Sequence, residues 1–332
     1  MAKRKKLRPL LWVLSPLEML MMPAHLSADP LESARRVSFY SDHTKLAGLL
    51  WVPKTIQLGK KLPAVVLARG FGSLKEFVNP GFAMRLNQEG YIALAFDYRG
   101  LGESGGIPGN LVPLDHCEDI RACMTFLESV PEVDTEKIGL IGDSMGASHV
   151  IYAAALDKRA KCVISYGGPG NMDRWFRGLI GYERYLDWKK KIEENRRQRT
   201  LTGNSAYVST FDFLAFSQRE RQEWDVMRKE FPKIMPDITV DTVERYLEYE
   251  PELVVDRISP RPLFLVTAET SVIVPPDESD FLYQKAREPK KLWVIPHSTA
   301  DFRYATHSKG HGYSEPVANA FLDWLKQWIP PS

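Results

Sequence analysis

Ser144 is the residue best placed for chemistry in this sequence, because it stands between two glycines in the stretch G-D-S-M-G. A serine hydroxyl can attack a carbonyl carbon when a neighbouring base takes its proton. An apolar run at 137–142 leads into the stretch, and a helical pattern follows at 144–157. A sharp strand-to-helix turn needs a strained apex and small residues two positions away, which Gly142 and Gly146 supply. We therefore predict that Ser144 is a nucleophile on such a turn; the simpler interpretation is a small-residue turn without chemistry.

A second glycine-rich segment, LARGFGSLKE, follows the apolar run at 63–68. A loop in that position can direct a backbone N–H at the oxygen of a bound carbonyl, and the helix that begins after Ser144 offers another. We predict that Phe71 and Met145 supply these two donors and form an oxyanion hole. Arg69 precedes the loop. It either binds a substrate carboxylate or, in the interpretation we favour, forms a salt bridge inside the protein.

Short apolar runs alternate with helical patterns over most of the chain. Four runs lack polar alternation, as is typical of strands buried on both faces of a parallel sheet; they lie at 63–68, 91–96, 137–142 and 161–166. Two more strands are predicted at 262–268 and 291–296. Two earlier runs, 35–40 and 46–53, predict an antiparallel pair. Helices are predicted at 76–89, 113–130, 144–157, 278–287 and 314–328. This alternation predicts an α/β fold with a mostly parallel, doubly wound sheet.

Residues 170–255 interrupt the alternation, because they are helical in pattern and rich in aromatic and basic residues. We predict a helical lid inserted into a core formed by residues 35–169 and 256–332, with residues 1–34 as a separate N-terminal helical segment. Most lid aromatics are expected to form the lid's own core. A subset is expected to line an apolar pocket at Ser144. The predicted pocket residues are Arg69, Trp175, Phe176 and Tyr182.

The composition is that of an ordinary globular protein: 44% of the 332 residues are hydrophobic, 26% are charged and the formal net charge is +2. This near-neutral balance gives no support to a nucleic-acid partner. Pro9, Pro16 and Glu18 interrupt the apolar N-terminal stretch, so we expect a cytoplasmic protein rather than one that enters a membrane. The three cysteines lack metal-binding spacing, so no metal is expected and all three are predicted to be buried: Cys117, Cys123 and Cys162.

Four segments together resemble the α/β-hydrolase superfamily, near its dienelactone-hydrolase-like and acetyl-xylan-esterase-like branch. They are AVVLARGFGSLKE, YIALAFDYRGLGESGG, VDTEKIGLIGDSMGA and PLFLVTAETSVIVPPDES, in the family's order and spacing. The resemblance covers residues 35–170 and 255–330 and leaves the lid uncovered. It implies an α/β-hydrolase fold and hydrolysis of esters, thioesters or lactones by a Ser–Asp–His triad, with no cofactor.

Two of the three triad positions are replaced in this sequence. The family's acid follows the penultimate strand, and the matching position in AETSVIVPP is Ser271. The family's histidine follows the last strand, and the matching position in PHSTADFRY is Ala300. Because loss of a triad member costs a serine hydrolase several powers of ten in rate, weak hydrolysis is expected unless other residues replace the missing ones.

Three interpretations of these replacements stay open. In the first, neighbouring residues rebuild the triad, with Glu269 or Asp301 as the acid and His307 or His311 as the base. In the second, both positions were substituted deliberately, to trap a substrate or to make room for another reaction. In the third, the chain is a natural relative that uses the pocket without hydrolysis.

The sequence therefore predicts a serine hydrolase of the esterase, lactonase or thioesterase type by ancestry, with an altered triad. The expected substrate is a small apolar ester or a related carbonyl compound. The alternative is a non-hydrolytic catalyst or a ligand-binding protein that uses the same pocket. A homodimer stays open.

Overall fold

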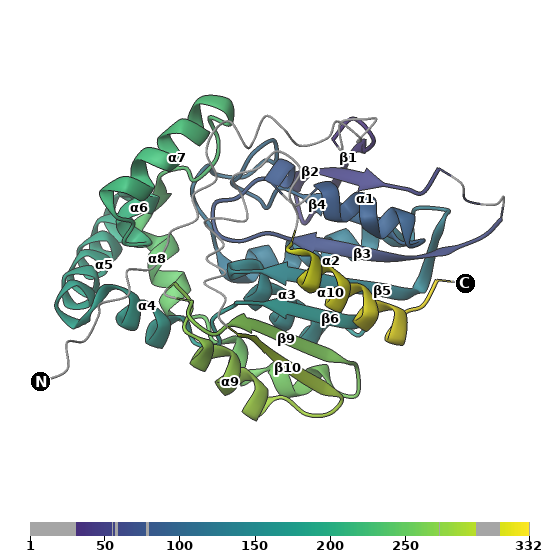
Figure 1. Ribbon diagram of the computed structural model, residues 1–332. Helices are drawn as coiled ribbons and strands as arrows, with labels where there is room; N and C mark the ends of the chain where they lie inside the picture. Colours follow the sequence, from purple (N-terminus) through teal and green to yellow (C-terminus); the bar gives the residue numbers. More distant parts are fainter. Residues whose placement is uncertain are drawn as a thin grey trace, which may run out of the picture.

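The computed structural model describes residues 31–54, 56, 59–77, 80–271, 273–296 and 313–331. Within them, eight strands form one sheet in the order β1-β2-β4-β3-β5-β6-β9-β10. Helices cover both faces of this sheet, and a further group of helices stands at one end of it (Figure 1). The predicted α/β fold is confirmed. The predicted N-terminal helix falls on residues 1–30, which lie outside the described residues, and residues 31–34 form a turn.

Six strands pair in parallel and supply the centre and one edge of the sheet. They are β3 (Leu62–Ala68), β4 (Ile92–Phe96), β5 (Val133–Asp143), β6 (Ala160–Tyr166), β9 (Leu263–Ala268) and β10 (Lys290–Ile295). Every residue of β3, β4 and β9 is buried, which explains why these strands lack polar alternation. The predicted antiparallel pair is β1 (Arg35–Ser41) with β2 (Thr44–Trp51), and β2 in turn pairs antiparallel with β4.

Helices cover both faces because alternate strand residues point to opposite sides of the sheet. Val66 of β3 belongs to the hydrophobic cluster that includes α2 (Pro113–Glu128) and α3 (Met145–Leu156). Its neighbour Val65 belongs to the cluster on the other face, with α1 (Pro80–Gln88) and α10 (Glu315–Trp328). The α9 helix (Pro276–Lys285) packs against β9 and β10. All five predicted helices are therefore present. The first is shorter than predicted, because Lys75–Phe77 form a separate 3₁₀ turn.

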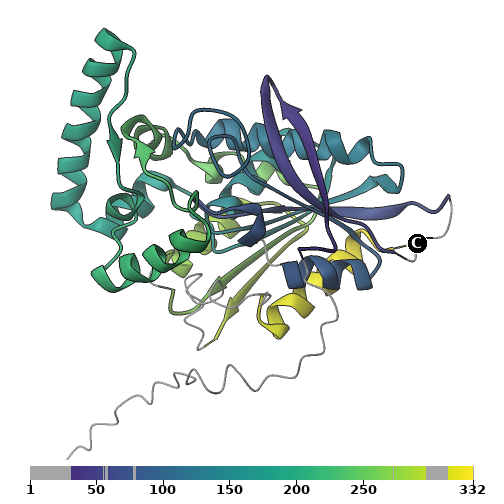
Figure 2. The ribbon, with the colours of Figure 1, turned by 90° about the horizontal axis from the view of Figure 1, so that it is seen from above.

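The segment between β6 and β9 forms an insertion that is mostly helical. Its helices are α4 (Met172–Ile180), α5 (Tyr182–Thr202), α6 (Thr210–Phe213), α7 (Gln218–Glu230) and α8 (Val240–Leu247), followed by 3₁₀ turns at Pro251–Leu253 and Val255–Ile258. One feature was not predicted: β7 (Tyr207–Val208) and β8 (Ile238–Thr239) pair as a short antiparallel ribbon. Figure 2 shows the long helix α5 at the outer edge of the molecule.

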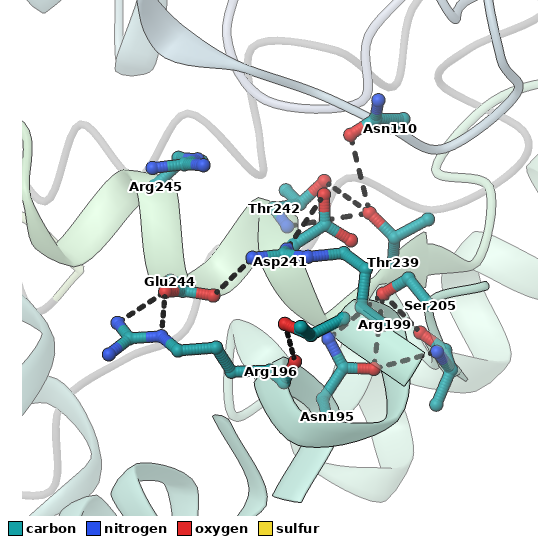
Figure 3. Close-up of polar contacts among 12 residues, drawn as sticks. Asn110, Asn195, Arg196, Arg199, Ser205, Thr239, Asp241, Thr242, Glu244 and Arg245 are labelled. Atoms are coloured by element: carbon teal, nitrogen blue, oxygen red, sulfur yellow. Dashed lines mark hydrogen bonds and ion pairs between the residues drawn. The ribbon is translucent and has the colours of Figure 1, made fainter. Parts of the chain in front are cut away.

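Polar contacts hold the insertion together and attach it to the core (Figure 3). Glu244 of α8 is 4% exposed and accepts a 2.7 Å hydrogen bond from the guanidinium of Arg196 on α5. The hydroxyl of Thr242 accepts the N–H of Leu111 at 2.8 Å and donates to the carbonyl of Gly109 at 3.1 Å. Because these two partners belong to the loop after β4, the start of α8 is fixed against the core.

The three cysteines are buried free thiols, as predicted. Cys117 and Cys123 lie on α2, and Cys162 lies in β6. In the described part of the chain, no helix combines the length and the apolar character that a membrane crossing requires.

Candidate active site

Ser144 stands at the apex of a sharp turn between β5 and α3. Its backbone has φ 53° and ψ −126°, a conformation that a residue with a side chain rarely adopts. The N–H of Ser144 donates to the carbonyl of Tyr166 at 2.9 Å, which ties the apex to β6. A Cβ added to Gly142 would lie 2.2 Å from the carbonyl oxygen of Gly146, and a Cβ on Gly146 would lie 2.3 Å from that of Ala68. The turn therefore has the strained apex and the close approach that the two glycines predicted.

The loop that follows β3 lies directly against Ser144. The ladder between β3 and β5 ends where Ala68 pairs with Gly142. Two residues farther along both segments, a Cβ added to Gly70 would lie 2.9 Å from the Cβ of Ser144 and 3.3 Å from its Oγ. A glycine at position 70 therefore leaves room for the serine side chain. This requirement was not predicted, although Gly70 stands inside the predicted loop.

The two predicted oxyanion donors lie on the two segments that meet at Ser144. Met145 is the first residue of α3, so its N–H has no acceptor within the helix. Phe71 follows Gly70 in a turn, and its ring contacts Phe213 and Tyr246 of the insertion at centroid distances of 5.1 and 5.2 Å. The side chains of Met145 and Phe71 are both buried, which fixes the backbone beside them. Among the described residues, neither N–H donates to a backbone carbonyl outside the regular elements.

Arg69 forms the internal salt bridge that we favoured from the sequence. Its Nη1 lies 2.6 Å from Oδ2 of Asp143, the residue before Ser144. The side chains are 12% and 4% exposed, so the ion pair is largely shielded from water. Burial raises the pKa of Asp143, and the charge of Arg69 opposes that rise. Asp143 was not predicted as a site residue, although a carboxylate at the end of a buried strand, directly before the serine, was a usable signal.

A second buried ion pair holds the far end of the same loop. Lys75 is 1% exposed, and its Nζ lies 2.8 Å from Oδ2 of Asp97, which is fully buried. The backbone N–H of Lys75 also donates to Asp97, at 2.7 Å. Burial disfavours the charge of Lys75, yet its contacts with Asp97 raise its pKa. This pair fixes the loop after β3 to the loop after β4, and it was not predicted.

The acid position of the resemblance falls on a neutral side chain. Ser271 follows β9 and is 9% exposed, and its hydroxyl accepts the N–H of Val274 at 3.3 Å. Glu269, a predicted substitute, is exposed at the end of β9, where its N–H donates to the carbonyl of Ile295 at 3.1 Å. Both residues therefore lie at the carboxyl end of a parallel strand, the same edge of the sheet as Ser144.

The predicted positions for the base fall on residues 297–312, outside the described residues. They are Ala300, His307 and His311, and Asp301, a predicted substitute for the acid, lies in the same range. Two other histidines are buried, His116 on α2 and His149 on α3. Burial lowers the pKa of His116 to about 3 and that of His149 well below its usual value. The ring of His149 contacts the hydroxyls of Tyr249 and Tyr246, each at 3.3 Å. These two histidines are therefore neutral interior groups.

A comparison with known families identifies the fold and the class. The family model described as serine aminopeptidase, S33, matches residues 59–299. The chain belongs to this family of α/β hydrolases. The matched range includes the loop after β3, Ser144 and Ser271, and it supports a hydrolase-type function.

Individual proteins support the same assignment. The chain is 30% identical to polyketide transferase ATR5 of Stachybotrys chlorohalonatus over 245 residues, which is 70% of this chain and 80% of that protein. It is 28% identical to a thiohydrolase of Eupenicillium brefeldianum over 282 residues, 80% of this chain and 83% of that one. Its fold matches the crystal structure of the α/β hydrolase GrgF from Penicillium sp. sh18 with a TM-score of 0.73, at 23% identity, over 89% and 99% of the two chains.

The predicted pocket aromatics of this hydrolase occupy different environments. Trp175 is 3% exposed, and its indole N–H donates to the carbonyl of Ile273 at 2.7 Å, so α4 holds the loop after β9. Phe176 is fully buried and stacks on Phe213 at 5.0 Å. Tyr182, in contrast, is 65% exposed and stacks on its neighbour Tyr185, which places it on the outer surface of α5 rather than in the interior.

Proposed function

We propose that this hydrolase transfers acyl groups from a small apolar ester or thioester, with Ser144 as the nucleophile. The observation that carries this proposal is the strained backbone of Ser144, with φ 53°, at a point where Gly70 leaves space against its Oγ. Strain of this kind persists only where the surrounding structure enforces it, and it concentrates at functional sites. A turn that served only to connect β5 to α3 would not require it.

The reaction begins when Oγ of Ser144 attacks the carbonyl carbon of the substrate. The carbonyl oxygen becomes negatively charged and accepts hydrogen bonds from the N–H groups of Phe71 and Met145. When the tetrahedral intermediate collapses, the bond to the leaving group breaks, the proton of the Ser144 hydroxyl passes through water to the leaving group, and an acyl-serine forms. Water, or a second acceptor in a transferase, then attacks the same carbonyl, and its proton returns to Oγ as the acyl–oxygen bond breaks and Ser144 is released.

A thioester suits this site better than an oxygen ester. The comparison proteins named as a thiohydrolase and a polyketide transferase point towards acyl-thioester chemistry. A thiol has a pKa of about 8.5, so a thiolate leaves without the protonation that an alkoxide needs. Because Ser271 carries no charge to orient a base, a substrate that needs little acid–base assistance is the better match.

A ligand-binding protein without hydrolysis is the second candidate, and Ser271 is the observation that favours it. Its hydroxyl accepts a local N–H from Val274 and does not ionise. A histidine beside it would lack the negative charge that stabilises its protonated form. In that case the elbow and its donors would bind a carbonyl group without cleaving the substrate.

Labelling with a fluorophosphonate probe distinguishes the two candidates. We expect one probe per chain, attached at Ser144, and complete loss of labelling in Ser144→Ala. Ser129→Ala, a change at an exposed serine after α2, should label as the wild type does. Turnover should then be compared between an N-acetylcysteamine thioester and the matching ethyl ester of the same acid, and we expect the thioester to react at least tenfold faster. An unlabelled wild-type chain would contradict the proposed nucleophile and favour the binding protein.

A further inference from the structure

The two segments that build the candidate site continue side by side after their backbone pairing has ended. The β3–β5 ladder ends at the pair Ala68 and Gly142. The next position on each segment holds Arg69 and Asp143, whose side chains form the 2.6 Å salt bridge. The position after that brings Gly70 against Ser144. The register of the two strands is thus maintained beyond the ladder by an ion pair and a close contact.

Each proposed oxyanion donor lies two residues beyond one member of this ion pair. Phe71 follows Arg69 on the segment after β3, and Met145 follows Asp143 on the segment after β5. The two N–H groups therefore belong to segments that hydrogen bonds between strands no longer join. An oxyanion hole requires both donors to lie about 2.7–3.1 Å from one oxygen atom. Some other contact must set the separation of the two segments.

The surroundings of the Arg69–Asp143 ion pair allow it to set the separation of the two segments. Arg69 is 12% exposed and Asp143 is 4% exposed, so water competes weakly for either charge. Nε of Arg69 also reaches Oγ of Ser73 at 3.5 Å, within the same loop. A charge-assisted contact at 2.6 Å, anchored in the loop and at the strand end, limits how far the two segments can separate.

We propose that Arg69 and Asp143 are positioning residues that set the distance between the Phe71 and Met145 N–H groups. The inference rests on the proposed function, because it concerns the geometry of the same oxyanion hole. Neither charged side chain touches the substrate. The pair acts through the backbone, so its loss lowers the rate of acylation of Ser144 and leaves the affinity for the ligand nearly unchanged. Removing the charge of either Arg69 or Asp143 breaks the same ion pair and therefore has the same consequence.

The test measures the maximal rate and the half-saturating concentration of fluorophosphonate labelling at Ser144, at a temperature where circular dichroism shows each variant to be folded. R69M and D143N each remove one charge of the pair, and R69K retains the charge on a shorter, non-planar group. R99M is the matched control. Arg99 forms a similarly buried ion pair with Asp119 at 2.7 Å, with side chains 14% and 0% exposed, and it lies outside the proposed machinery.

We expect R69M and D143N to lower the maximal labelling rate at least tenfold with less than a threefold change in half-saturation. R69K should recover part of the rate, and the double variant R69M/D143N should be no slower than the slower single variant. R99M should label within threefold of the wild type. Equal losses in R69M and R99M, or an unchanged rate in R69M, would overturn the positioning role alone. A wild-type chain that does not label at Ser144 would overturn the proposed function and this inference with it.

Discussion

The candidate site has two sides, which differ in how strongly the fold depends on their residues. The nucleophile side is the turn at Ser144 with the loop after β3, and the acid side is the loop after β9 with Ser271. At the junction of β3 and β5, a Cβ on Gly142 or Gly146 would collide with backbone atoms, so neither glycine can change without distorting the turn. At the end of β9, Ser271 satisfies a local hydrogen bond with Val274, and the fold accepts a neutral residue there. The geometry of the turn at Ser144 is therefore part of the fold, whereas the residue at position 271 can be neutral without disturbing it.

The largest expected effect comes from restoring the acid side. We predict that Ser271→Asp combined with Ala300→His raises p-nitrophenyl ester turnover by about three powers of ten, because a carboxylate and a base would then activate Ser144. Steady-state kinetics measures the gain, and Ser144→Ala in the same background should abolish it. The neutral pair Ser271→Asn with Ala300→His is the control and should gain far less. Flat activity in the charged double variant would remove both triad assignments.

The nucleophile side is expected to tolerate no such exchange. Gly146→Ala should destabilise the protein by about 3 kcal/mol or leave it unfolded, because the added Cβ would lie 2.3 Å from the carbonyl oxygen of Ala68. Urea denaturation measures the change. Gly178→Ala in α4 is the matched control: nothing lies within 4 Å of its added Cβ, so the helix should gain about 0.5–1 kcal/mol. Equal stability in the two variants would contradict the close approach.

A smaller effect is expected from acid, which should lower the stability of the core on the nucleophile side. His116 is buried on α2, beside α3, and burial lowers its pKa to about 3, below the unfolded value of 6.5. Between these two values the unfolded chain binds the extra proton, so stability falls as the pH is lowered. His116→Phe, which keeps a ring stacked on Tyr98, should reduce that slope by about 1.4 kcal/mol per pH unit. Urea titrations at pH 6 and pH 4 measure it, and an unchanged slope would mean that His116 does not contribute.

The smallest predicted effect concerns the contact between α4 of the insertion and the loop after β9. Trp175→Phe keeps an aromatic ring but removes the donor that bonds to the carbonyl of Ile273 at 2.7 Å. We expect a loss of about 1 kcal/mol in unfolding free energy, because the partly buried carbonyl of Ile273 loses its donor. Hydrogen exchange should rise at Ile273 and Val274 more than at Ser144. An equal rise in hydrogen exchange at the loop after β9 and at Ser144 would mean that Trp175 supports the whole core rather than that loop.

Most elements could be predicted from the chain because their signals are local. The runs 63–68 and 137–142 became strands buried on both faces, and the glycines around Ser144 marked the turn between β5 and α3. The ribbon of β7 and β8 was not predicted, since each strand has two residues and carries no periodicity. Tyr182 was assigned to a pocket by helical spacing alone, and spacing does not say which face of an isolated helix meets the core.

The sequence by itself determined that a serine would stand between two glycines at the end of a buried strand, because a tight turn imposes its requirements on adjacent residues. Only the tertiary structure decided what meets that serine. Arg69 and Asp143 are 74 positions apart, and Lys75 and Asp97 are 22 apart, yet each pair is in direct contact. Such partners are chosen when parallel strands line up across the sheet, and that alignment depends on burial summed over the whole core rather than on any short stretch of chain.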